Sequence, residues 1–258
     1  MAEYPPSARR QFWVELMADH AATHSYAQPA PWWLQPAATV TILSAFVVYV
    51  FWAAFQGRGY FAPYLSPFYS PPIAIASIPI SPAFWVLWAP GGFRATCYYY
   101  RKAYYRSYFA DPISCLIPEG RRRYTGETAF PFVLNNLHRY LLYAAIVVLI
   151  FLWIDAVRAF IFSGHFEVRL GSLLFLANVV LLSGYTLGCH AFRHMVGGNL
   201  DCFSCATAGR LRYRLWGWVT PLNLRHALWA WTSLFSVVTA DVYVRLLMSG
   251  AIIDLRIL

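Results

Sequence analysis

Long stretches without charge alternate with short charged joints along the chain. The first stretch runs from Leu34 to Gln56 and follows directly after Trp32 and Trp33. A transmembrane helix needs about 20 mostly apolar residues, and tryptophan gathers at the membrane interface. Residues 34–56 are therefore predicted to form a first membrane-spanning helix.

The second predicted helix begins at Ser81 and Pro82, which suit the N-cap and the first helical turn. It continues to Phe109, with an expected kink or interruption at Pro90-Gly91-Gly92. The stretch before it, "FAPYLSPFYSPPIAIASIPISP", contains too many prolines for a continuous helix.

Three further apolar stretches predict helices over residues 135–162, 168–195 and 222–250. Asp155 with Arg158, and Asp241 with Arg245, are spaced to form ion pairs within one helical turn. Both pairs are interpreted as structural, and a proton path through them stays an alternative.

Composition agrees with a membrane protein, since 59% of the residues are hydrophobic and only 12% are charged. Such a chain cannot surround one soluble core. The predicted fold class is all-α, an integral membrane bundle of five transmembrane helices with a cytoplasmic N-terminus. Residues 1–33 are expected to form an interfacial arm without a cleavable signal peptide, and residues 34–258 the helical domain.

The distribution of basic residues supports this orientation. With the N-terminus inside, fifteen lysines and arginines fall on the cytoplasmic side and five outside, as the positive-inside rule requires. The net charge of +9 is thus explained by topology, together with an acidic partner or lipid surface, rather than by nucleic acid.

Cysteines and histidines gather on the same side of the predicted bundle. All five cysteines are placed in its cytoplasmic half, where a reducing compartment argues against disulfides. Four histidines lie near helix ends at a matched depth. The set is Cys97, Cys115, Cys189, Cys202, Cys205, His138, His190, His194 and His226.

Thiols and imidazoles together suit zinc or an iron-sulfur cluster, whereas haem alone would need imidazoles without thiols. His190 and His194 have the i, i+4 spacing of a chelating pair on one helix face. A single membrane cysteine is more often a small hydrophobic residue, and interfacial histidines often bond only a headgroup or a neighbouring helix. "CFSC", Cys202 to Cys205, has no second CxxC and is interpreted as a solvated loop.

Four runs carry a resemblance to a known family: "FRATCYYYRKAYYRSYF", "RRRYTGETAFPFVLNNLHRY", "YTLGCHAFRHMVGGNL" and "RYRLWGWVTPLNLRHALWAWTSLFSVVTADVYV". In this order they resemble the membrane-anchor subunit of actinobacterial succinate dehydrogenase, the respiratory complex II with a single five-helix anchor. The resemblance covers about residues 94–244. It implies a multi-pass plasma-membrane protein bound to a flavoprotein and an iron-sulfur subunit, which passes electrons to menaquinone or ubiquinone.

The resemblance also implies a Rieske-type [2Fe-2S] cluster, in which two cysteines bind one iron and two histidines the other. The expected thiolates are Cys97 and Cys189, with Cys115 in reserve. The favoured imidazoles are His190 and His226, chosen over His138 and His194. Expected contacts of a nearby quinone are Tyr98, Arg139, Tyr185 and Arg193.

Two other function classes stay open at this point. One is a haem b quinone-reactive cytochrome subunit, in which the cysteines only pack. The other is a non-redox membrane protein whose Cys and His residues bind zinc. The resemblance leaves undecided whether several complexes associate.

Overall fold

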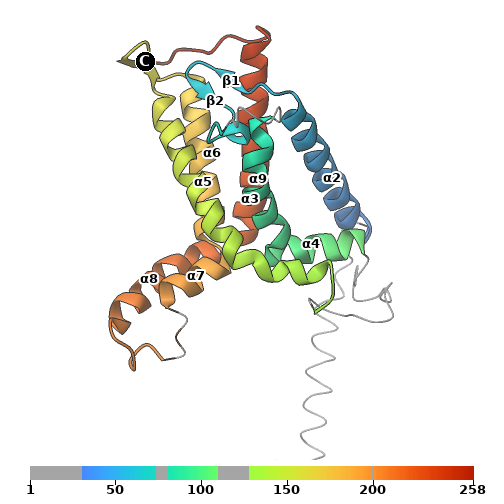
Figure 1. Ribbon diagram of the computed structural model, residues 1–258, viewed down its shortest axis with the longest axis vertical. Coiled ribbons are helices and arrows are strands. Elements are labelled where there is room, and N and C mark those ends of the chain that lie inside the picture. The colour runs from blue at the N-terminus through green and yellow to red at the C-terminus, as the bar shows by residue number, and fades with distance from the viewer. Residues whose placement is uncertain (1–30, 74–80, 110–127, 199, 201) are drawn as a thin grey trace, which may run out of the picture.

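The computed structural model describes residues 31–73, 81–109, 128–198, 200 and 202–258. In this part of the chain, long helices form a bundle, with two short hairpins at one end and shorter helices at the other (Figure 1). The elements are α2 (Leu34–Phe55), β1 (Tyr60–Phe61), β2 (Tyr64–Leu65), η1 (Pro67–Tyr69), α3 (Pro82–Thr96), α4 (Tyr98–Tyr108), η3 (Phe132–Leu137), α5 (His138–Arg158), β3 (Ile161–Phe162), β4 (His165–Phe166), α6 (Leu170–Leu187), α7 (His190–Gly197), α8 (Gly209–Leu224) and α9 (His226–Met248).

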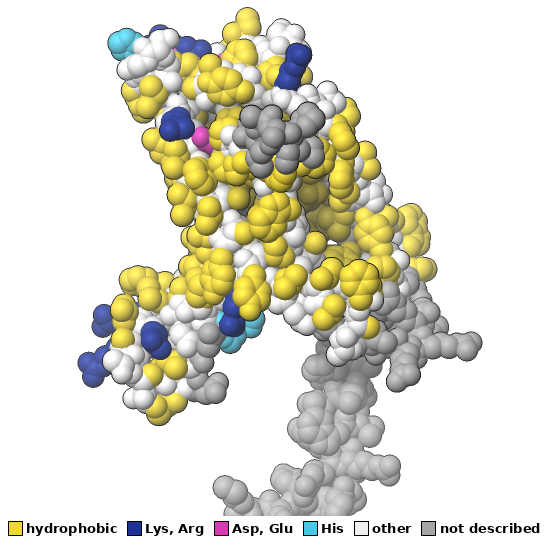
Figure 2. Space-filling model, viewed as in Figure 1, with side chains coloured by type: hydrophobic (Ala, Val, Ile, Leu, Met, Phe, Trp, Pro, Cys, Tyr) yellow, Lys and Arg dark blue, Asp and Glu magenta, His cyan; other side chains and the backbone are white. Residues whose placement is uncertain are grey.

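Four helical segments of the described chain are long and apolar enough to cross a membrane: α2, η3 with α5, α6 and α9. Hydrophobic side chains cover much of the long helices in the view of Figure 2. The helix α3, of 15 residues, packs against α5 within the bundle. A fifth crossing, the cytoplasmic N-terminus and a domain boundary near residue 34 therefore stay predictions.

The second predicted helix is in fact two helices. It begins at Pro82 as expected, but α3 continues through Pro90 to Thr96 and ends at Cys97, whose backbone is extended (φ −62°, ψ 131°). After this turn α4 runs across the end of the bundle (Figure 1). The sequence "YYYRKAYYRSY" of α4 is far more polar than α3, so it suits an interface, where tyrosine and basic side chains reach water.

The fourth predicted helix is also divided. The helix α6 ends at Leu187, Cys189 is extended (φ −64°, ψ 143°), and α7 begins at His190. A Cβ on Gly188 would lie 2.5 Å from the carbonyl oxygen of Gly184 and 3.1 Å from that of Leu222. The backbone of α8 thus passes directly beside this break, and Asn223 Nδ2 donates a hydrogen bond to the Gly188 carbonyl at 2.9 Å.

The helix α8 was not predicted from the sequence. Pro221 was expected to precede the fifth helix, yet it lies inside α8, and α9 begins only at His226. The sequence of α8, "GRLRYRLWGWVTPLNL", places arginines among tryptophan, tyrosine and leucine. Because it packs against α7 rather than crossing the bundle, its pattern is that of a surface helix.

The hairpin end of the bundle is closed by buried acids. Asp254 accepts hydrogen bonds from the hydroxyls of Tyr64 and Tyr243, both at 2.6 Å, and from the Gly171 amide at 3.0 Å. Tyr64 is fully buried, and a Cβ on Gly171 would collide with its ring. The C-terminal tail is therefore fastened to both β2 and α6.

The predicted pair of Asp241 and Arg245 is confirmed at 2.7 Å. Asp241 is fully buried and also accepts hydrogen bonds from Tyr49 of α2 and from Ser66, each at 2.5 Å. These bonds attach α2 and the first hairpin to α9. The other predicted pair differs, because Asp155 accepts a hydrogen bond from Ser70 instead of pairing with Arg158.

Replacing Asp241 with leucine is expected to lower the free energy of unfolding by about 3–5 kcal/mol, because Arg245 then keeps a half-buried charge without its partner. The measurement is thermal unfolding of the purified complex in detergent. The pair of Glu167 and Arg169 lies nearer the surface, with side chains 14% and 28% exposed against 0% and 16% for Asp241 and Arg245. It gives a control: Glu167→Gln should cost less than Asp241→Leu, about 1 kcal/mol. Equal losses in the two variants would contradict this account.

Candidate metal centre at four helix corners

Two cysteines and two histidines lie where helices begin or end. Cys97 separates α3 from α4, and Cys189 separates α6 from α7. His138 is the first residue of α5 after η3, and His226 the first of α9 after α8. We call this group the Cys–His centre. Its members come from four corners of the chain that share one end of the bundle.

The Cys–His centre consists of two contacts between a thiol and an imidazole. Cys97 Sγ lies 3.4 Å from His226 Nε2, and Cys189 Sγ lies 3.0 Å from His138 Nε2. Both cysteines are 2% exposed and belong to one packed core cluster. Each contact therefore joins residues more than 50 positions apart in a dry environment.

Aromatic rings enclose the two imidazoles. Phe93 stacks on His138 at 4.7 Å, and Tyr185 stacks on His226 at 5.0 Å. The two enclosing rings meet edge to face at 5.5 Å. On its other side His138 Nδ1 lies 2.9 Å from Thr96 Oγ1. These contacts fix the orientation of both imidazole planes before any ligand binds.

Burial keeps the Cys189 thiol of the centre neutral when no metal ion is bound. Burial raises the pKa of the Cys189 thiol to about 12, with Cys97 adding to the rise and the amides of Ala191 and Phe192 opposing it. Without a cation the thiol thus stays protonated, whereas a metal ion would deprotonate it.

Two polar atoms beside the centre are buried without a hydrogen-bond partner in the described chain: His226 Nδ1 and the Tyr185 hydroxyl. Buried polar atoms without partners are rare and ask for an explanation, such as an absent ion. The two thiols and two imidazoles of the centre match the donors that a metal group with mixed sulfur and nitrogen ligands requires.

Among the described residues, no three or more His, Cys, Asp or Glu side chains lie close enough together to hold one metal ion. The arrangement is instead two adjacent Cys–His pairs. It differs in this respect from a structural zinc site, in which four ligands surround one ion.

The remaining ligand candidates lie elsewhere. His190 and His194 are exposed on α7, with their Nε2 atoms 3.0 Å apart, so the expected i, i+4 pair forms on the outer face. Cys115 lies outside the described residues. Cys202 and Cys205 form a disulfide, with Cα atoms 5.5 Å apart. The expectation of free thiols throughout is wrong for this loop, which brings the two residues together in a tight turn.

The four expected quinone contacts are not gathered at one place. Tyr185 is buried in the Cys–His centre, whereas Tyr98 is 68% exposed beside Cys97. Arg193 faces α8, where it bonds Thr220 and lies 3.8 Å from the Trp216 ring. Arg139 is on the exposed side of α5.

Sequence reasoning missed the role of Arg94, which it counted only as a positive charge of the inner side. Its side chain is buried and donates hydrogen bonds to Tyr100 and Ser233, at 2.6 and 2.8 Å. It also lies 4.4 Å from the Tyr185 ring. The signal that could have revealed it is a lone arginine one turn before a cysteine, in a long uncharged stretch.

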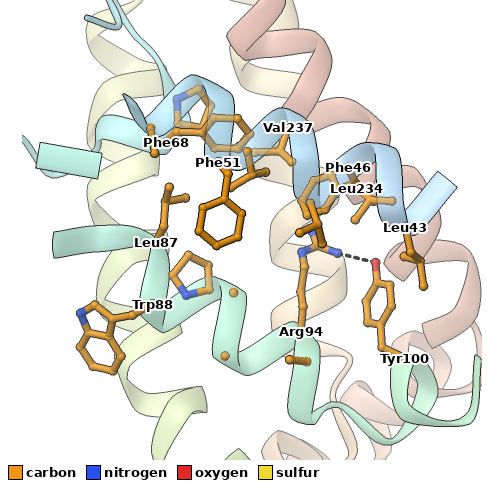
Figure 3. A pocket seen from close by; sticks show the side chains of 18 of the residues that line it. Leu43, Phe46, Phe51, Phe68, Leu87, Trp88, Arg94, Tyr100, Leu234 and Val237 are labelled. Carbon is orange, nitrogen blue, oxygen red and sulfur yellow. Dashed lines mark hydrogen bonds between the residues drawn. The ribbon is translucent and has the colours of Figure 1, made fainter. Parts of the chain in front are cut away.

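An apolar cavity of about 620 Å³ lies between α2, α3 and α9. Figure 3 shows Phe51, Leu87 and Trp88 on one side of it, and the hydrogen-bonded Arg94 and Tyr100 on the other. The helix α2 packs mainly on α4. Room is therefore left between α3 and the middle of α2. One polar side of this cavity is thus formed by the arginine that touches Tyr185.

The sequence profile of one family, described as actinobacterial succinate dehydrogenase subunit SdhC, matches residues 34–250. The chain belongs to this family. A solved chain from "Mycobacterium smegmatis Sdh1 complex in the apo form" is similar to it, with 41% identity and a TM-score of 0.80, over 90% of this chain and 94% of that one. Among curated proteins no match is found.

The predicted membrane-anchor identity is therefore confirmed. As a member of the SdhC family, the chain is a multi-pass plasma-membrane subunit of succinate dehydrogenase, whose catalysis takes place on a partner subunit. The apolar helices supply the anchor.

Replacing Gly184 with alanine is expected to move α6 away from α9 at the level of the Cys–His centre. A Cβ there would lie 2.6 Å from the Trp229 ring, and overpacking of this kind costs about 1–3 kcal/mol. Thermal unfolding of the complex measures the loss. Gly217→Ala in α8, where nothing lies within 4 Å, is the matched control and should be neutral or slightly stabilising. If both variants unfold alike, the close approach of α6 and α9 is not a constraint.

Proposed function

We propose that this SdhC subunit receives electrons from the iron-sulfur subunit of succinate dehydrogenase and passes them to a quinone through a Rieske-type [2Fe-2S] cluster. Its ligands are Cys97, Cys189, His138 and His226. The observation that carries the proposal is the pair of Cys–His contacts at 3.4 and 3.0 Å in one buried core.

The donor set favours this cluster over the alternatives. A Rieske-type cluster takes two cysteines and two histidines, which is the composition of the Cys–His centre. A haem b site would use the imidazoles and leave two buried thiols in contact with them. The choice of His138 in place of His190 follows from burial, since His190 is exposed on α7 and contacts His194.

The orientation follows from the positive-inside rule. In the described chain, ten lysines and arginines lie at the end of the bundle formed by α4, α7 and α8, and five at the hairpin end. The Cys–His centre then faces the cytoplasm, at the surface where the flavoprotein and iron-sulfur subunits bind. This places the centre next to the partner that delivers electrons.

When bound, the cluster supplies one-electron transfer at a potential raised by its histidine ligands. The chain's own residues prepare the site for it. Phe93 and Tyr185 hold the imidazole planes by stacking, and the buried core excludes water. Thr96 Oγ1 lies 2.9 Å from His138 Nδ1, so its hydroxyl can fix the tautomer that leaves Nε2 facing Cys189.

The quinone is proposed to approach the centre from the lipid through the apolar cavity. Its isoprenoid tail matches the lining of α2 and α3, and a quinone carbonyl oxygen can accept a hydrogen bond from a remaining N–H of Arg94 at the polar side (Figure 3). Tyr185, one of the four contacts expected from the sequence, lies between Arg94 and His226. Tyr98, Arg139 and Arg193 would instead serve a site near the surface.

Replacing His138 and His226 together with alanine is expected to abolish the Rieske-type EPR signal of the purified complex and to reduce quinone reduction by more than about 100-fold. Succinate-dependent dye reduction by the soluble subunits should persist, because it does not pass through this centre. The measurements are EPR after chemical reduction and the two activity assays on one preparation.

The matched control is the variant with both His190→Ala and His194→Ala, which removes two exposed imidazoles from α7. It should keep the EPR signal. A signal that survives the His138 and His226 substitutions but is lost with the α7 histidines would refute the ligand set. A haem absorption band in the wild-type anchor would favour the cytochrome alternative.

Gly91 lines the cavity, and nothing lies within 4 Å of a Cβ there. Replacing it with phenylalanine is therefore expected to fill part of the cavity. The KM for a long-tailed quinone should rise at least about tenfold, because the loss of binding free energy from about two buried methylenes corresponds to about this factor. Gly217→Phe on the exposed side of α8 is the control. An unchanged KM in the Gly91 variant would exclude this cavity as the quinone route.

A further inference from the structure

Arg94 is a buried cation without a countercharge in the described chain. Its guanidinium is surrounded by hydrogen-bond acceptors that are all neutral: the hydroxyls of Tyr100 and Ser233, and the Ala230 carbonyl at 3.2 Å. The ion pairs of the described residues involve other arginines. Three of the five N–H groups of Arg94 thus have an acceptor, while its charge is not balanced.

This state costs free energy. Arginine cannot lose its proton in a protein, and a charge buried without an opposite charge is strongly unfavourable. Tyr100 does not supply the missing anion, because burial raises its pKa to about 12, and its hydroxyl donates to the Ala230 carbonyl at 2.6 Å. The position of Arg94 therefore calls for an anion that the polypeptide alone does not provide.

The guanidinium lies close to the Cys–His centre. Its Cζ lies 4.4 Å from the Tyr185 ring, which stacks on His226 at 5.0 Å. The guanidinium and the His226 imidazole are thus at most about 10 Å apart, with one aromatic ring between them.

We propose that Arg94 is the positioning residue that supplies the countercharge for the reduced metal group and so raises its midpoint potential. This inference rests on the proposed function, since it needs the cluster. With two thiolate and two neutral imidazole ligands, the oxidised group has no net charge. It gains one negative charge when it takes up one electron from the iron-sulfur subunit, and no covalent bond forms or breaks.

The expected size follows from Coulomb's law. Two unit charges about 10 Å apart, in an effective dielectric of about 20, interact strongly enough to change an equilibrium constant by about tenfold. For a one-electron couple, a tenfold change corresponds to about 59 mV. Removing the charge of Arg94 should therefore lower the midpoint potential of the centre by about this amount.

The experiment is a redox titration of the purified complex, followed by the EPR signal of the anchor's centre. Arg94→Gln removes the charge and keeps a polar side chain, whereas Arg94→Lys keeps the charge. Arg225→Gln is the matched control, because it removes an exposed cation next to His226 in the sequence, whose field water and salt screen. For Arg94→Gln we expect the equilibrium constant for reduction of the centre to fall about tenfold, which lowers its midpoint potential. For Arg94→Lys and for Arg225→Gln, the shift in midpoint potential should be at most about a third as large.

Each outcome decides the proposal. A centre that assembles in Arg94→Gln with the wild-type potential overturns the countercharge role, and so does an equal shift in Arg94→Lys, which would assign the effect to hydrogen bonding. If Arg94→Gln loses the centre while Arg94→Lys keeps it at the wild-type potential, the charge itself is required, as proposed. If neither variant assembles the centre, Arg94 only supports packing. A wild-type complex without the Rieske-type signal overturns the proposed function as well, which separates the two failures.

Discussion

Four helix corners of this molecule meet at contacts between buried thiols and imidazoles. Cys97 and Cys189 each occupy an extended residue between two helices, and each meets the first residue of a long helix, His226 or His138. Neither contact is strong without a ligand, because thiols are weak donors and acceptors. A metal group bound by all four would convert them into a rigid junction of α3, α5, α6 and α9.

The surroundings of this junction are arranged in layers. The rings of Phe93 and Tyr185 cover the imidazoles, and Arg94 lies behind Tyr185 at the wall of an apolar cavity. At the opposite end, buried carboxylates fasten the first hairpin and the C-terminal tail to the bundle. One end of the structure is thus closed by polar contacts within the chain. At the other end, the thiols and imidazoles of the Cys–His centre are available to a metal group, next to the surface proposed for the partner subunits.

The sequence predicted the features that depend on local pattern. Apolar length gave the long helices, and the spacing of Asp241 and Arg245 gave their ion pair, because both follow from helix geometry. The break at Cys189 could not be predicted, because it depends on packing with α8. The break at Cys97 falls where the apolar sequence of α3 changes to the polar sequence of α4, a local signal that was missed. His138 was underrated for a similar reason: which of four histidines lies beside Cys189 is decided by how α5 packs, not by its neighbours in sequence.

The central claim is that two histidines of this chain bind a [2Fe-2S] cluster together with two cysteines. Pulsed EPR of the reduced wild-type complex, prepared with histidine labelled by nitrogen-15, tests it most directly. The account predicts two strongly coupled histidine nitrogens on the anchor's centre, one of which is lost in His138→Ala or in His226→Ala if that single variant retains a cluster. A reduced cluster without coupled histidine nitrogens would contradict the account, and so would an anchor that carries haem or zinc alone.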